Sequence, residues 1–154
     1  MFRYIHTNII AKDCAKLIDF YKAVLGCKSI GEGRDLRGDW VDRLTGVPGA
    51  HIWGEHLCLP GYEADRPTLE IFQYNKEEVG DPPQINRCGI AHLAFEVDDV
   101  EETLDKVLAA GGGRIGEIVR VEYANGRKLV LVYATDIEGN IIELQSRYDY
   151  LTGS

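Results

Sequence analysis

The chain has 154 residues, 45% hydrophobic and 27% charged, which is the composition of a folded globular protein, and its length excludes an assembly of several large domains. A formal net charge of −8 opposes the phosphate neutralisation that nucleic-acid binding requires, and no segment has the roughly 20 apolar residues of a membrane-spanning helix. We therefore expect neither nucleic acid nor a membrane as a partner. Because the start of the chain shows no secretory signal, we expect a cytoplasmic location.

The first half of the chain predicts a strand, an amphipathic helix and three more strands. Residues 4–9 alternate in polarity and place His6 on the more polar face of a strand. Asp13 stands where a helix N-cap should be, and Gly26 ends the apolar repeat that follows. Further strands are expected at 27–32, 50–59 and 68–74. Residues 35–49 have no counterpart elsewhere in the chain, and we interpret them as an inserted loop.

The second half repeats this order of elements. A strand around His92 precedes a helix that is capped by Asp98 or Asp99 and ended by the glycines at 111–113. Strands are expected at 114–123, 127–135 and 140–145, with a hairpin turn at 124–126. Each half therefore has the order βαβββ. We divide a single domain, 1–154, into modules at about 1–79 and 88–148, joined by an ordered linker at 80–87.

A shift of 86 positions aligns the two halves with each other. In the 21 positions from residue 6 to residue 26, five residues are identical in the two copies, where chance would give about one. The identities are His6 with His92, Asp13 with Asp99, Asp19 with Asp105, Ala23 with Ala109, and Gly26 with Gly112. The periodicity of strand and helix repeats along with these residues. We conclude that the chain carries an internal duplication.

The duplication brings together a candidate set of metal ligands. Glu70 and Glu143 each stand between aliphatic neighbours on the last strand of their half, so alternation turns each carboxylate away from the buried face. With His6 and His92 they form two imidazoles and two carboxylates. Such a set would neutralise a divalent cation and leave coordination positions open for water or substrate. The expected cofactor is one divalent metal ion, namely Zn, Ni, Co, Mn or Fe(II).

Other polar and aromatic residues give weaker signals. His51 and His56 are five positions apart on one strand, so at most one can reach a shared cavity, and we interpret both as surface or structural residues. Arg34 and Arg37 are expected in a glycine-flanked loop, where they can contact an anionic substrate tail or only solvent. The aromatic residues of the strands and the inserted loop are interpreted mainly as core, with lining of an apolar pocket as the alternative: Trp40, Trp53, Phe72, Tyr74 and Tyr133.

Four segments of the chain resemble the vicinal oxygen chelate superfamily, which includes glyoxalase I, methylmalonyl-CoA epimerase, extradiol dioxygenases and bleomycin-resistance proteins. The segments are His6 with DFYKAVLG at 19–26, TLE at 68–70, AHLAFEVDD at 91–99, and DIEGNIIEL at 136–144. The resemblance implies an α+β fold in which paired βαβββ modules form an open, incomplete mixed β-barrel around a metal held at His6, Glu70, His92 and Glu143. This ligand order is similar to glyoxalase I, whereas epimerases often carry Gln at the position of Glu70.

The expected activity is that of a divalent-metal-dependent lyase or isomerase of the glyoxalase type, similar to lactoylglutathione lyase. A substrate with neighbouring oxygens, such as a glutathione hemithioacetal or a CoA thioester, would lose a proton next to a carbonyl and form a metal-bound enediolate. Glu143 is the expected general base, with Glu70 as its partner on the opposite side. A homodimer is expected, with the site formed either within one chain or across two.

Three alternatives remain open from the sequence. An epimerase similar to methylmalonyl-CoA epimerase would return the proton to the opposite face of the same carbon. An extradiol dioxygenase needs two histidines and one carboxylate on Fe(II), so Glu70 would be surplus. A metal-free binding protein of the drug-resistance kind would use the acidic groove for a cationic ligand, in keeping with the net charge of −8.

Overall fold

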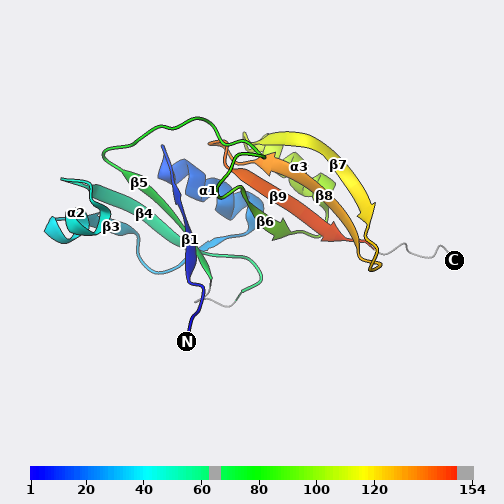
Figure 1. Cartoon of the computed structure of the whole chain (residues 1–154), viewed down its shortest axis with the longest axis horizontal. Helices are drawn as coiled ribbons and strands as arrows, with labels where there is room; N and C mark the ends of the chain where they lie inside the picture. The colour runs from blue at the N-terminus through cyan, green and yellow to red at the C-terminus, as the bar shows by residue number, and fades with distance from the viewer. Residues whose placement is uncertain (63–66, 149–154) are drawn as a thin grey trace. The chain divides into compact units, whose positions relative to one another are not determined.

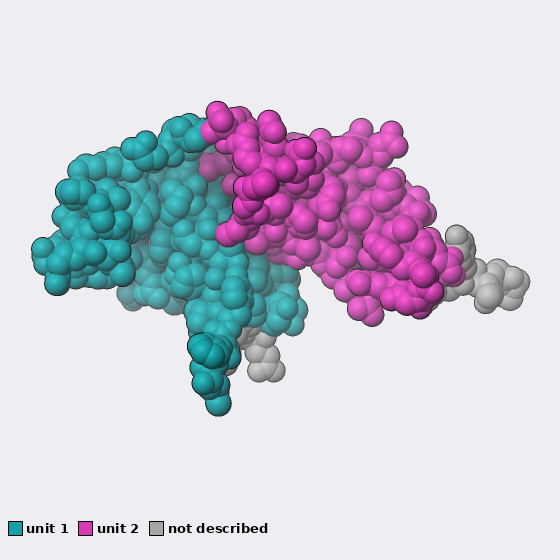
Figure 2. Space-filling model, viewed as in Figure 1, with its two compact units in different colours: residues 1–80 teal, residues 81–154 magenta. Residues whose placement is uncertain are grey.

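The computed structural model describes residues 1–62 and 67–148, and the chain forms two compact units. Unit 1 comprises residues 1–80 and unit 2 comprises residues 81–154, as Figure 2 shows in teal and magenta. Each unit contains one mixed β-sheet together with its own helices (Figure 1). Each module of the duplicated sequence therefore forms its own sheet.

Unit 1 contains five strands and two helices. In chain order they are β1 (His6–Ile10), α1 (Cys14–Leu25), β2 (Lys28–Ser29), β3 (Arg34–Arg37), α2 (Asp39–Thr45), β4 (His51–Cys58) and β5 (Thr68–Tyr74). The sheet has the order β1-β5-β4-β2, and β3 also pairs with β4. β1 runs parallel to β5, whereas β2, β3 and β5 are antiparallel to β4. This order places β5 between β1 and β4, so that residues of three neighbouring strands share one face.

The helix α1 forms as the sequence predicts. The Asp13 side chain accepts a hydrogen bond from the backbone N–H of Lys16 at 3.2 Å, and Gly26 closes the helix with φ of +71°. The helix contacts β4 and β5, and Leu17 and Tyr21 of the helix are completely buried. Leu57, Leu69 and Ile71 are the completely buried residues of the two strands. One face of the sheet is thereby covered, and the other face is left for a site.

The expectation of an inserted loop at 35–49 is wrong, because this segment contains the end of β3 and the two-turn helix α2. The helix begins after Gly38 and ends at Gly46, whose φ is +72°. The carboxylate of Asp42 accepts hydrogen bonds from the N–H groups of Gly49 and Ala50, at 2.7 and 3.0 Å. The helix α2 has seven residues, of which Val41 alone is buried, so its sequence does not show the repeating apolar positions that indicate a helix.

Unit 2 repeats the topology of unit 1 with four strands and one helix in its described part. The elements are β6 (His92–Glu96), α3 (Val100–Ala109), β7 (Gly113–Glu122), β8 (Lys128–Thr135) and β9 (Ile141–Arg147), and the sheet order is β6-β9-β8-β7. Asp99 caps α3 by accepting a hydrogen bond from Glu102 N–H at 2.8 Å. β6 runs parallel to β9, as β1 does to β5. The expected α+β class with two βαβββ-like sheets, neither closed, is confirmed.

Two further features of the fold concern membrane-spanning helices and the cysteines. None of the helices in the described residues 1–62 and 67–148 is long and apolar enough to span a membrane. All four cysteines are free thiols, and Cys14 and Cys27 are buried whereas Cys88 is exposed.

Cys27 gives the fold a pH dependence at alkaline pH. Burial, assisted by the neighbouring Cys58, raises the pKa of the Cys27 thiol from 9.0 to about 12. Above about pH 9 the unfolded chain loses this proton while the folded chain keeps it, so the free energy of unfolding falls as the pH rises toward 12. We expect a loss of about 1 kcal/mol between pH 8 and pH 10, measured by urea unfolding. Cys27→Ala should remove this pH-dependent loss, and Cys88→Ala should leave it in place.

Candidate functional site

The uncovered face of the unit 1 sheet carries a row of polar side chains across three strands. In the strand register, Asn8 of β1 and His56 of β4 both stand opposite Glu70 of β5, one on each side. His6 lies two residues before Asn8 on the same face, because side chains alternate along a strand. The sheet register thus brings His6 and Glu70 of the predicted set together and adds Asn8 and His56.

Glu70 is held by three side chains in this row. Its Oε2 atom lies 3.3 Å from His6 Nε2 and accepts a hydrogen bond from Asn8 Nδ2 at 3.1 Å. Its Oε1 atom lies 2.7 Å from His56 Nε2. Glu70 is 8% exposed, so these contacts replace the water that a surface carboxylate would have. The buried negative charge is therefore compensated from both neighbouring strands.

His56 is a functional candidate that the sequence interpretation missed. Burial is the main influence on its pKa and lowers it from the usual 6.5, while the Glu70 carboxylate acts in the opposite direction. At neutral pH the ring is therefore mainly uncharged, and its Nε2–H donates to Glu70. The sequence showed that only one of His51 and His56 could reach the cavity but did not show which one. The cross-strand pairing of His56 with Glu70 identifies it.

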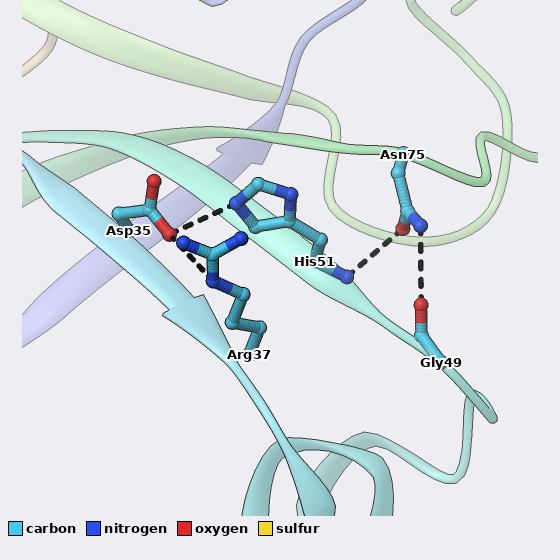
Figure 3. A network of polar contacts seen from close by, with 5 residues as sticks. All are labelled: Asp35, Arg37, Gly49, His51 and Asn75. Atoms are coloured by element: carbon cyan, nitrogen blue, oxygen red, sulfur yellow. Dashed lines mark hydrogen bonds and ion pairs between the residues drawn. The ribbon is translucent and has the colours of Figure 1, made fainter.

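His51 lies in a different network, which Figure 3 shows. Its ring Nε2 contacts Asp35 Oδ1 at 2.9 Å, and Arg37 Nε lies 3.7 Å from the same oxygen. The backbone N–H of His51 donates to Asn75 Oδ1 at 2.9 Å, and Asn75 Nδ2 donates to Gly49 O at 3.1 Å. These contacts join β3, β4 and the end of β5. The structural role predicted for His51 is confirmed.

A cavity of about 410 Å³ lies beside the polar row, within unit 1. Asn8, His56 and Glu70 form its polar wall, and Arg34 of β3 also lines it. The rest of the wall is mainly apolar and comes from β3, β4, β5 and α2: Leu36, Leu44, Thr45, Ile52, Phe72 and Tyr74. The cavity therefore offers an oxygen- and nitrogen-rich wall next to an apolar one, which is the general character of a small-molecule site.

Some of the arginines and aromatic residues line the cavity and others do not, a distinction that the sequence left open. Arg34 lines the cavity, whereas Arg37 contacts Asp35 in the outer network. Both lie in strand β3 rather than in the glycine-flanked loop that we expected. Of the aromatic residues, Phe72 and Tyr74 line the cavity and Trp53 contacts the His51 ring. Trp40 is 50% exposed, so its assignment to the core is wrong.

Unit 2 presents the equivalent pair, His92 and Glu143. His92 Nε2 lies 3.1 Å from Glu143 Oε2, and its other nitrogen, Nδ1, is buried without a hydrogen-bond partner among the described residues. Tyr133 of β8 stands opposite Glu143 in the register, as His56 stands opposite Glu70. Burial, and the Glu143 carboxylate to which the hydroxyl donates a hydrogen bond, raise the pKa of Tyr133 from 10.0. Each unit thus contains a His–Glu pair.

Within each pair, the nitrogen and the oxygen have the spacing of two ligands on a metal ion. Two donor atoms at about 2.1 Å from an ion, separated by 90–110°, lie about 3.0 to 3.4 Å apart. The nitrogen–oxygen distances of 3.3 Å in unit 1 and 3.1 Å in unit 2 fall in this range. Within residues 1–62 and 67–148, no group of three or more His, Cys, Asp or Glu side chains is arranged to hold a metal by itself. Each pair by itself therefore has the spacing of two ligands and no more.

Comparison with known proteins extends over nearly the whole chain. The sequence pattern of the glyoxalase/bleomycin resistance protein/dioxygenase superfamily matches residues 3–144. The lactoylglutathione lyases of two Neisseria meningitidis strains, of serogroups A and B, are each 28% identical over 147 residues, covering 92% of this chain and 88% of theirs. Because the match spans most of the sequence, it does not depend on the four candidate ligands alone.

Solved structures share the fold. A glyoxalase family protein from Bacillus cereus has a TM-score of 0.77 at 20% identity and covers 96% of this chain and 94% of its own. A mutant of a fosfomycin resistance protein from Listeria monocytogenes, in complex with Mn(II) and a dihydroxypropylphosphonic acid, has a TM-score of 0.57 at 18% identity, with 94% and 91% covered. From its sequence and its fold, the chain belongs to the glyoxalase/bleomycin resistance protein/dioxygenase superfamily.

Proposed function

We propose that this protein is a divalent-metal-dependent lyase or isomerase of the glyoxalase type. The proposed ligands are His6, Glu70, His92 and Glu143, and the expected metals are Zn, Ni, Co, Mn and Fe(II). The observation that carries the proposal is the His–Glu pair present in each unit, at nitrogen–oxygen distances of 3.3 and 3.1 Å. Two imidazoles and two carboxylates balance a divalent charge and leave positions open for substrate oxygens.

The side chains around the pairs suit chemistry next to a carbonyl group. A bound divalent ion would supply Lewis-acid stabilisation to the substrate oxygens. Glu143 is the proposed general base, taking a proton from the substrate carbon at a carboxylate oxygen and returning it to the neighbouring carbon. Glu70 is the proposed partner of Glu143. The apolar wall of the unit 1 cavity, with Ile52 and Phe72, excludes water from one side of that carboxylate.

Two relatives support this class of activity. The Neisseria meningitidis proteins that are 28% identical to the chain are lactoylglutathione lyases, whose name describes chemistry on a glutathione thioester. The Listeria monocytogenes structure, on the same fold, contains Mn(II) and a dihydroxypropylphosphonic acid, whose hydroxyl groups are on neighbouring carbons. We infer a substrate with neighbouring oxygens, for which the glutathione hemithioacetal of methylglyoxal is the first candidate. We also infer a homodimer, which light scattering on the purified protein tests.

Metal analysis followed by two assays tests the proposal. We expect the purified protein to bind one divalent ion per chain and to convert the methylglyoxal–glutathione hemithioacetal, with activity lost on chelation and restored by added metal. Turnover of methylmalonyl-CoA instead would identify an epimerase, and oxygen uptake with a catechol would identify a dioxygenase. A protein that binds no divalent ion with micromolar or tighter affinity contradicts the proposal and leaves the metal-free binding role.

A further inference from the structure

We propose that His56 and Asn8 fix Glu70 in place, so that Glu70 is an anchored carboxylate and Glu143 is the one free to move. The inference rests on the proposed function, because it assigns different roles to the two carboxylates of the same site. His56 and Asn8 are positioning residues, since they act through Glu70.

The contacts of Glu70 come from opposite sides. His56 on β4 donates to Oε1 at 2.7 Å, and Asn8 on β1 donates to Oε2 at 3.1 Å. Rotation of the carboxylate away from this arrangement would leave two donors without an acceptor in a site where Glu70 is 8% exposed. Oε2 also faces His6 Nε2 at 3.3 Å, so Oε2 is the oxygen that stands with the imidazole ligand. Oε2 is therefore the oxygen that would hold a metal ion together with His6.

The duplicated register shows that Glu143 lacks one of the three contacts that hold Glu70. The position equivalent to Asn8 is Ala94, which stands opposite Glu143 and has no side-chain donor. The position equivalent to His56 is Tyr133, whose hydroxyl is the donor on the other side. Glu143 is therefore held by His92 and Tyr133, whereas Glu70 has the equivalent contacts with His6 and His56 and in addition the Asn8 donor. Removal of Glu143 from its resting position breaks fewer hydrogen bonds.

The difference assigns the proton-transfer step to one residue. A carboxylate that must leave its resting contacts, accept a proton from carbon and return it needs freedom to rotate, which Glu143 retains. Glu70 keeps its place throughout, and His56 and Asn8 determine its orientation. Hydrogen bonds to ligating carboxylates of this kind typically change metal affinity about 10- to 100-fold when they are removed.

Variants of His56 test the inference by metal affinity, a readout independent of turnover. His56→Leu removes the donor and keeps a similar volume, and His56→Gln retains an N–H near the position of Nε2. His51→Leu is the matched control, because His51 lies on the same strand but contacts Asp35. Asn8→Ala removes the second donor. Affinity for Zn(II) and Co(II) is measured by competition with a chromophoric chelator, and the Co(II) absorption spectrum reports the ligand geometry.

We expect His56→Leu to weaken metal binding about 10- to 100-fold and to change the Co(II) spectrum, with Asn8→Ala in the same direction. His56→Gln should recover most of the affinity, and His51→Leu should match the wild type. Circular dichroism confirms that each variant is folded. If His56→Leu and Asn8→Ala bind metal as tightly as the wild type, the anchoring role is wrong while the metal site stands. If the wild type binds no metal, the proposed function itself fails.

Discussion

Glu143→Gln should lower turnover about 10³-fold while most of the bound metal is retained. The substitution keeps the shape of the side chain and one carbonyl oxygen, so a ligand position is preserved, but the amide accepts no proton from carbon. General base catalysis contributes about 10²- to 10⁴-fold in enzymes, which sets the size of the expected loss. Steady-state kinetics with the methylglyoxal–glutathione hemithioacetal and metal analysis of the same preparation measure the two effects separately.

Two further variants complete this experiment. Glu117→Gln, at an exposed position of β7, makes the same chemical change away from the pair and should leave turnover unchanged. Glu70→Gln should lose metal affinity together with activity, since we infer that Glu70 is the anchored ligand. Wild-type turnover in Glu143→Gln contradicts the role of general base. Loss of metal from Glu143→Gln to the same extent as from Glu70→Gln contradicts the different roles of the two carboxylates.

The helix and strand positions were predictable because their signals are local. A cap such as Asp13 or Asp99 satisfies a backbone N–H three residues ahead, and glycine at position 26 adopts a left-handed conformation at the helix end. Residues 68–71 alternate in polarity, and the strand predicted at 68–74 has the bounds of β5 in the structure. These interactions lie within a few residues, so the sequence displays them directly. The α+β class followed from the same local signals once the duplication had been recognised.

The features that the sequence analysis missed depend on contacts between strands. His56 is one histidine among other polar residues of β4 until the register places it beside Glu70. Asn8 shares a strand with His6, but its hydrogen bond to Glu70 joins residues 62 positions apart. Strand alternation determines the face of a side chain and does not determine its cross-strand partner. The anchoring contacts of Glu70 therefore required the structure.

The helix α2 was missed for a different reason. Its seven residues bury only Val41, and the remainder of its support comes from Asp42, whose side chain accepts from backbone groups beyond the helix. Hydrophobic periodicity needs several buried positions before it differs from a loop. Because Leu44 and Thr45 of this helix line the cavity, the prediction of a loop also left out part of the cavity wall.

Gly54→Ala should destabilise the sheet of unit 1 that carries the site, lowering the free energy of unfolding by about 3 to 5 kcal/mol. Gly54 has φ of +148°, and a Cβ there would lie 2.0 Å from the carbonyl oxygen of Ile71 and 2.9 Å from the Cα of Phe72. Both neighbours are main-chain atoms of β5, so relief requires β4 and β5 to separate. Gly54 is two residues from His56, and the separation would disturb the pairing of His56 with Glu70.

Thermal unfolding measures this effect, and we expect a midpoint lowered by about 10 °C with a parallel loss of metal affinity. Gly80→Ala is the matched control, because Gly80 does not have a positive φ and a Cβ there meets no atom within 4 Å. At such a position alanine stabilises the fold by up to about 1 kcal/mol, since it restricts the unfolded chain. The two alanine substitutions should therefore shift the midpoint in opposite directions. A Gly54→Ala variant with the wild-type midpoint would show that β4 and β5 adjust without loss of pairing.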